Sequence, residues 1–259
     1  MTNSTICRPT VKEVSDFLSE YAVQLFGSGA TCIRMEKNMH RIARSQDMEA
    51  SFSILPRHIH LTVTGHDNTV TSVVAIRDLP ISFAKIALLS KLSWQMADRH
   101  LDFCHASRAL SRIVRTPGAN PWLLLVLVSL ANASFCRLFG GDMVAMVIVF
   151  VATFAGFLVK QMLMERHVDF RLTAVVCSFV SAVLASSDAL FSLGATPEIA
   201  VGTSVLYLIP GIPFINSFCD MIDRHYLCSF GRMMNAVVLS CCLSAGLCAG
   251  MMLMNLGMF

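Results

Sequence analysis

The chain has 259 residues, of which 55% are hydrophobic and 14% are charged, and its formal net charge is +3. Soluble globular chains carry roughly 25% charged residues, so this composition excludes a wholly soluble protein and indicates membrane-spanning segments. The small net charge gives no reason to expect nucleic-acid binding, because the basic residues follow another pattern: 14 of the 20 Lys and Arg precede residue 116.

This uneven charge divides the chain into two predicted domains, a soluble domain at residues 1–116 and a transmembrane domain at residues 117–259. The opening residues MTNSTICRPT lack a basic start followed by an apolar core, so we expect no cleavable signal. The ten cysteines include no C-x-x-C pair and mostly lie in apolar blocks. We therefore interpret them as small hydrophobic residues rather than as a disulfide framework.

In the first domain, the spacing of apolar residues predicts an α+β fold in the order ααβββα. Helical spacing predicts helices at residues 11–26 and 31–45, and Gly27 and Gly29 end the first of them. Alternating apolar and polar residues predict three strands, at about 48–54, 58–64 and 69–76. One long helix, at about 82–114, is expected to lead to the membrane.

Five later segments are long and apolar enough to cross a bilayer, which takes about 20 mostly apolar residues. These predicted transmembrane helices lie at about 121–139, 142–164, 171–192, 198–216 and 234–258. Loop charge predicts the orientation, since Lys and Arg favour the cytoplasmic side. If the soluble domain and the loops after the second and fourth segments share one side, 19 of the 20 basic residues lie there, and only Arg137 lies opposite. We therefore expect a cytoplasmic N-terminus and a periplasmic C-terminus.

Several polar features of the soluble domain are candidate sites. A basic stripe on the second helix consists of Arg34, Lys37, Arg41 and Arg44. This stripe either binds an anion or lipid headgroups, or is a solvated helix face. His58 and His60 share a strand face and His66 lies near, but no further ligand has suitable spacing, so we expect no metal or other cofactor. No nucleophile motif such as G-x-S-x-G occurs, so we expect no enzyme.

The segment LIPGIPFINSFCD, residues 208–220, breaks an apolar stretch with two prolines and a glycine. From Glu198 to Ile209 the chain forms roughly 18 Å of helix, little more than half of a bilayer core. A break at Pro210 leaves the carbonyls of residues 206–209 without their usual donors, and transporters place substrates at broken helices of this kind. Either this segment lines an export path, or the fourth span ends here at the cytoplasmic interface.

Under the first interpretation, the transport path contains Pro210, Gly211, Pro213, Asn216, Asp220 and Asp223. The spacing of Asn216, Asp220 and Asp223 puts them on one face if the segment is helical, and Asp220 is then a charge-sensing or proton-carrying group.

Two further features lie in the apolar blocks. Gly246 and Gly250 form a G-x-x-x-G pattern, which lets helices approach closely, either within this chain or against a partner. Asp188 falls near the outer end of the third segment, where a position at the water interface is sufficient to explain it.

Three stretches of the chain resemble the threonine/serine exporter (ThrE) family. They are GATCIRMEKNMHRIA (residues 29–43), TVTSVVAIRDLPISFAKI (69–86) and LIPGIPFINSFCDMI (208–222). The first contains family positions of unknown role, namely Gly29, Arg34, Glu36 and Arg41. The third is close to the family signature Pro-Gly-x-Pro-x-x-Asn-x-x-x-Asp. SFCRLFGGD and QMLMERH, residues 134–142 and 161–167, are similar to the YjjP-type subunit of the family's two-component branch.

The resemblance implies a bacterial inner-membrane exporter of threonine and serine or, for the YjjP-type branch, of succinate or a similar dicarboxylate. It also implies a second membrane subunit (YjjB-type), because single-chain members carry a second membrane half that this chain lacks. No nucleotide-binding motif is present, so we expect the proton gradient to drive export. Two other classes fit the same residues: a membrane-anchored hydrolase, and a membrane scaffold that does not transport.

Overall fold

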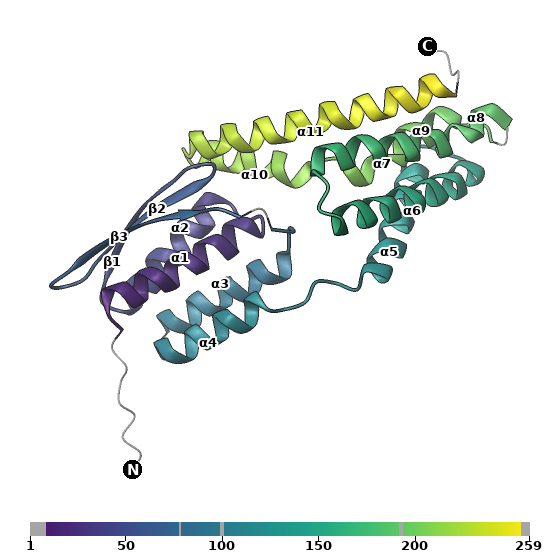
Figure 1. Ribbon diagram of the computed structural model, residues 1–259. Helices are drawn as coiled ribbons and strands as arrows, with labels where there is room; N and C mark the ends of the chain where they lie inside the picture. Colours follow the sequence, from purple (N-terminus) through teal and green to yellow (C-terminus); the bar gives the residue numbers. More distant parts are fainter. Residues whose placement is uncertain (1–8, 78, 99–100, 192–193, 255–259) are drawn as a thin grey trace. The chain divides into compact units, whose positions relative to one another are not determined.

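The computed structural model describes residues 9–77, 79–98, 101–191 and 194–254. The chain forms two compact units, whose elements are labelled in Figure 1. The first unit contains residues 1–118 and 212–234, and the second contains residues 119–211 and 235–259. A segment that follows four apolar blocks in the sequence therefore belongs to the same unit as the N-terminal residues.

The first unit begins with two helices whose apolar faces are buried. α1 (Val11–Gly27) starts with a capping box, in which the Glu13 carboxylate accepts hydrogen bonds from the backbone N–H and the hydroxyl of Thr10. α2 (Cys32–Ser45) follows after a short loop. The core side chains of the two helices recur at helical spacing and include Val14, Leu18, Tyr21, Leu25, Met35, Met39 and Ile42. The two predicted helices are confirmed to within a residue at each end.

A three-stranded antiparallel sheet covers these helices. Its strands are paired in sequence order and are β1 (Glu49–Ile54), β2 (His58–Thr64) and β3 (Thr69–Ala75). Ile59, Leu61 and Val63 of β2 are fully buried while the residues between them face outward, as the alternating pattern predicts. The hydroxyls of Ser15 on α1 and Ser72 on β3 lie 2.8 Å apart and join the sheet to the helices. The three predicted strands are confirmed.

The predicted long helix at 82–114 is wrong, because the chain forms two helices there. α3 (Phe83–Ala97) ends at Asp98, and α4 (Phe103–Val114) begins after Asp102. Aspartate is a poor residue for a helix interior, and Asp98 and Asp102 lie just outside these two helices, which pack against each other. Phe103 of α4 reaches the core, where its ring lies 5.5 Å from that of Phe17.

The second unit is entirely helical in its described residues. It contains α5 (Pro121–Leu138), α6 (Met143–Glu165), α7 (Phe170–Ala185), α8 (Ser187–Phe191) and α9 (Pro197–Ser204), and also the part of α11 (Tyr226–Leu253) that follows residue 234. Within the described residues, four helices are long and apolar enough to cross a membrane: α5, α6, the α7–α8 pair and α11. A fifth is present if the broken pair Pro197–Leu208 and Gly211–Ile222 counts as one span.

The chain does not form a continuous helix over the predicted fourth span, residues 198–216. α9 ends at Ser204, a 3₁₀ turn η1 (Leu206–Leu208) follows, and α10 (Gly211–Ile222) begins after Pro210. The break is where the prolines predict it, and Pro213 lies in the first turn of α10, where a helix tolerates a missing N–H. Of the carbonyls at residues 206–209, those of Leu206 and Ile209 accept backbone N–H groups, from Ile209 and Gly211, so these two are not free as predicted.

Candidate functional site: a buried cluster around Asp220

The three stretches that resemble the exporter family meet in the first unit, at the loop between α1 and α2. Gly29 in this loop has a φ of 95°, a left-handed conformation that favours glycine. The N–H of Ser82 donates to the Ser28 carbonyl at 3.0 Å, so the segment before α3 is held against the loop. A Cβ on Gly27 would lie only 2.8 Å from the carbonyl oxygen of Arg77, so a side chain there would push that segment away.

The PGIP stretch contributes α10 to the same place. The Asn216 side chain donates a hydrogen bond of 2.7 Å to the Gly29 carbonyl. Four residues later, Oδ1 of Asp220 accepts a hydrogen bond of 2.8 Å from the backbone N–H of Cys32, the first residue of α2. A carboxylate at this position satisfies one of the unpaired amides of the helix N-terminus and interacts favourably with the helix dipole.

Arg232, in the first turns of α11, completes the cluster. Its Nη1 lies 3.0 Å from Oδ2 of Asp220, an ion pair that is not aligned as a hydrogen bond. Its Nη2 donates to the Ala30 carbonyl at 2.7 Å, and its guanidinium lies 4.3 Å from the ring centroid of Phe26. The Asp220 side chain is fully buried and that of Arg232 is 15% exposed, so removal of either partner would leave the other buried and uncompensated.

We call Gly29, Cys32, Asn216, Asp220 and Arg232 the signature cluster. Its polar groups are paired with each other, which suits it to fasten α10 and α11 to the start of α2 rather than to perform chemistry. The pKa of the Cys32 thiol is raised by its hydrogen bond with Cys228 and by burial, so this thiol stays protonated and is a poor nucleophile.

Further contacts fasten the turn between α10 and α11. The hydroxyls of Ser217 and Ser229 each donate to the other residue's carbonyl, at 2.7 and 2.8 Å. His225 in the turn lies 3.3 Å from the carboxylate of Glu36 on α2. The Cys228 thiol donates to the Ile54 carbonyl at the end of β1. The α10–α11 turn is therefore held by both α2 and the β1–β2 hairpin.

The structure joins some of the residues predicted from the sequence and separates others. Asn216, Asp220, Gly29 and Glu36 lie in or beside the signature cluster, as described above. Arg34 is exposed on α2, and Asp223 is exposed beyond the end of α10. Arg41 lies away from the cluster: its guanidinium stacks 3.6 Å over Trp94 and donates to Ser93 at 2.7 Å. The basic stripe is thus not one uniform anion-binding face.

Arg232 is the residue that the sequence analysis missed. The predicted fifth span begins at residue 234, which leaves Arg232 in the loop before it, whereas α11 begins at Tyr226. The available signal was its position: Arg232 follows Asp220 at a distance that a helix–turn–helix hairpin can bring together.

The G-x-x-x-G pattern packs within the chain. A Cβ on Gly246 would collide with the Ser178 side chain and the Val175 carbonyl of α7, and one on Gly250 would lie 2.7 Å from the Cβ of Ala182. The two glycines are therefore required for close contact between α11 and α7, so the expectation of a partner-binding stripe at this position is not supported. The outward face of α11 carries Ala245 and Ala249 instead.

Two other candidates differ from the cluster. A position at the water interface was sufficient to explain Asp188, but the structure buries this side chain. Its carboxylate and that of Asp142 both lie close to Gly194. Among the described residues, no group of three or more His, Cys, Asp or Glu side chains is placed to hold a metal ion. His58 and His60 project from the exposed face of β2.

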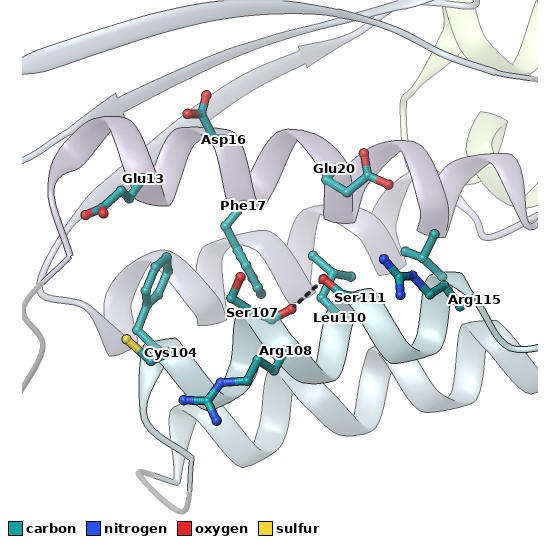
Figure 2. A pocket seen from close by; sticks show the side chains of 12 residues that line it. Glu13, Asp16, Phe17, Glu20, Cys104, Ser107, Arg108, Leu110, Ser111 and Arg115 are labelled. Atoms are coloured by element: carbon teal, nitrogen blue, oxygen red, sulfur yellow. Dashed lines mark hydrogen bonds between the residues drawn. The ribbon is translucent and has the colours of Figure 1, made fainter.

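A groove of about 750 Å³ lies between α1 and α4 (Figure 2). Its rim carries carboxylates from α1, including Asp16 and Glu20, and guanidinium groups from α4, those of Arg108 and Arg115. No ion pair joins the two rims within the described part of the chain. None of the signature-cluster residues line this groove, so it is separate from the family motif.

Known proteins resemble this chain over most of its length. The family model ThrE, described as "Putative threonine/serine exporter", matches residues 16–254. A Klebsiella aerogenes protein named "Probable succinate transporter subunit YjjP" is 27% identical over 252 residues, which cover 95% of each chain. The Escherichia coli K12 protein of the same name is 30% identical over 209 residues, covering 78% of this chain and 79% of that one. No solved structure matches this chain significantly.

The fold and the family match define a multi-pass membrane protein of the transporter class. The chain belongs to the threonine/serine exporter (ThrE) family, since the match covers most of its length, and it is similar to proteins named as succinate transporter subunits.

Proposed function

We propose that this chain is one subunit of a bacterial inner-membrane exporter of small metabolites. The substrate is succinate or a similar dicarboxylate, or else threonine and serine, and a second small membrane subunit of the YjjB type completes the exporter. The family match and the word "subunit" in the relatives' names support this proposal. The soluble domain is cytoplasmic and the C-terminus periplasmic, an orientation supported by the charge asymmetry of the sequence.

The signature cluster is the observation that carries the proposal. The stretch with the family signature ends a broken helix at Pro210 and then fastens α10 to α2 through Asn216 and Asp220. α10 follows the break that ends the apolar unit and is held in the first unit by a buried ion pair. A conformational change in one unit can therefore be transmitted along the chain to the other. In this role, residues 210–223 control the export path, with Pro210, Gly211 and Pro213 at the break.

The test is the distribution of metabolites in the native host with and without this gene. We expect deletion to raise the cytoplasmic level and lower the external level of one of these metabolites, and the intact gene to restore both. Restoration by Asp220→Ala at the wild-type rate would show that the cluster has no part in export.

The same experiment separates the competing classes. A hydrolase would change the total amount of a metabolite rather than its distribution across the membrane, and a scaffold would change neither. If deletion leaves both compartments unchanged for succinate, threonine and serine, the exporter assignment is wrong.

A further inference from the structure

The second unit contains a row of buried polar side chains beside the break after α9. We call Asn132, Thr153, Ser181 and Tyr207 the polar seam. Asn132, Thr153 and Ser181 are at most 4% exposed. Polar groups inside a membrane protein are costly unless they are paired, and they commonly mark the path of a substrate or ion.

Asn132 occupies the point where α9 stops. Its Nδ2 donates to the hydroxyl of Thr153 at 2.8 Å and to the carbonyls of Thr203 and Ser204 at 3.2 and 3.4 Å. Because α9 ends at Ser204, these two carbonyls have lost their usual helical donors. One amide from α5 therefore serves the open end of a broken helix.

Tyr207 adds a pair of hydroxyls to the seam. Its hydroxyl lies 3.0 Å from that of Ser181, which also lies 3.2 Å from the carbonyl of Ala152. Both hydroxyls lie directly over Gly156 of α6, where a Cβ would collide with each of them. Glycine at this position leaves room for two hydrogen-bonding groups between α6 and α7.

A single cation stands one helical turn beyond Gly156 on the same face of α6. The Lys160 ammonium lies 5.4 Å from the ring centroid of Phe157 and 5.6 Å from that of Phe170. Phe157 in turn packs against Tyr207, with the ring centroids 5.9 Å apart. No carboxylate of the described residues lies within ion-pair distance of Lys160. A half-buried cation that lies beside two aromatic rings and forms no ion pair with a described carboxylate is suited to attract an anion.

Resting on the proposed export function, we propose that Lys160 and the polar seam bind the carboxylate of the exported substrate, and that this substrate carries a net negative charge. Lys160 supplies the charge, and Tyr207, Ser181 and Asn132 supply neutral donors, whose present bonds the substrate replaces. None of the four polar-seam residues is acidic, so the seam offers no carboxylate to pair with the ammonium group of an amino acid. Asp188 on the following helix lies seven residues beyond Ser181, roughly 10 Å along the axis, and Asp169 is exposed at the other end of α7. The site therefore favours a dicarboxylate over a zwitterion.

The test uses the full chain in its native host, with the chromosomal gene deleted and each variant supplied in its place. Cells are loaded with labelled succinate or labelled threonine, and efflux is measured. Lys160→Met removes the charge while keeping an unbranched apolar side chain, and it should lower succinate efflux about tenfold or more, the loss expected for a hydrogen bond to a charged group. Lys160→Arg should restore most of it.

Two matched controls accompany these variants. Arg166→Met removes an exposed cation just beyond α6 and should stay within about twofold of the unmutated chain. Tyr207→Phe should lower efflux, whereas Tyr226→Phe, at an exposed tyrosine, should not. In parallel, succinate should raise the thermal unfolding temperature of the purified unmutated chain but not that of Lys160→Met.

The outcomes separate this inference from the proposed function. If Lys160→Met exports succinate at the rate of the unmutated chain, the site is wrong, Lys160 merely extends to the membrane surface, and the exporter assignment stands. If the unmutated chain exports threonine and not succinate, the charge assignment is wrong. If it exports neither, the proposed function fails and this inference fails with it.

Discussion

Asp220 and Arg232 lie 12 residues apart in the sequence, on the two helices of one hairpin, and Oδ2 of the first lies 3.0 Å from Nη1 of the second. Asp220 binds the first amide of α2, at Cys32, and Arg232 binds the Ala30 carbonyl in the loop just before it. The pair is buried, so each charge depends on the other. Loss of the ion pair should therefore lower the stability of the first unit, and any effect on transport should follow from that.

The first prediction concerns this pair. Asp220→Asn keeps the size of the side chain but leaves Arg232 without its counter-charge, which should lower the free energy of unfolding by about 3 kcal/mol. Arg232→Met in the same chain should recover part of that loss, because the uncompensated cation is gone. Thermal unfolding of the purified unmutated chain, of Asp220→Asn, of Arg232→Met and of the double variant measures the coupling between the two charges. Two additive losses would show that the charges do not depend on each other.

The second prediction concerns the contact between α11 and α7. Gly246→Leu with Gly250→Leu should prevent these helices from approaching and should destabilise the second unit by several kcal/mol. The reason is that even a Cβ at either position would collide with atoms of α7. The matched control is Ala245→Leu with Ala249→Leu, on the exposed face of the same helix. Protease sensitivity in detergent distinguishes the two. A stable, well-folded Gly double variant would contradict the packing described here.

The third prediction concerns topology. The predicted topology puts 19 of the 20 basic residues on one side, so a reporter active only in the cytoplasm should work when fused at Thr116, and one active only in the periplasm should work at Phe259. Activity of each reporter only at the opposite fusion site would reverse the orientation.

The fourth prediction concerns Asp142, the N-cap of α6. Its pKa is lowered because its carboxylate accepts hydrogen bonds from the backbone N–H groups of Ala195 and Ala145. A carboxyl whose pKa is lower in the folded than in the unfolded state stabilises the fold above its unfolded pKa, about 3.9, and loses this contribution as the pH falls through the folded value.

The unmutated chain should therefore be more stable than Asp142→Asn at pH 7, and the difference should shrink below about pH 4. Thermal unfolding in detergent between pH 7 and pH 3 measures this. A difference that is constant over the whole range would show that the charge of Asp142 contributes nothing.

Local pattern was sufficient to predict most of the secondary structure. Helical spacing and strand alternation are determined by neighbours within a few residues, so α1, α2 and all three strands could be located. The prediction of one long helix at 82–114 failed because apolar residues recur at helical spacing on both sides of Asp98 and Asp102, although α3 ends before the first and α4 begins after the second. Pattern also located the break at Pro210, but could not show that α10 packs on α2.

The candidate site was predicted less completely, because its contacts join distant parts of the sequence. The family signature identified Asn216 and Asp220, yet their partners at Gly29 and Cys32 are 187 and 188 residues away. Arg232 lies outside the signature, and only its separation from Asp220, which a helix–turn–helix hairpin can bring together, pointed to it. The same limit applies to Lys160 and Tyr207, whose relation depends on how α6 and η1 pack.

The capping of α2 by Asp220 also has a consequence for how the protein is made. The chain is synthesised from its N-terminus at about 5–20 residues per second, so Arg232 emerges many seconds after residue 118. During that interval α5 to α9 are translated while the amide of Cys32 and the carbonyls of Gly29 and Ala30 still lack their partners. The N-terminal unit can reach its final form only after most of the membrane helices have been translated. An insertion failure upstream of α10 would therefore leave this unit open at α2, where quality-control proteases can recognise it.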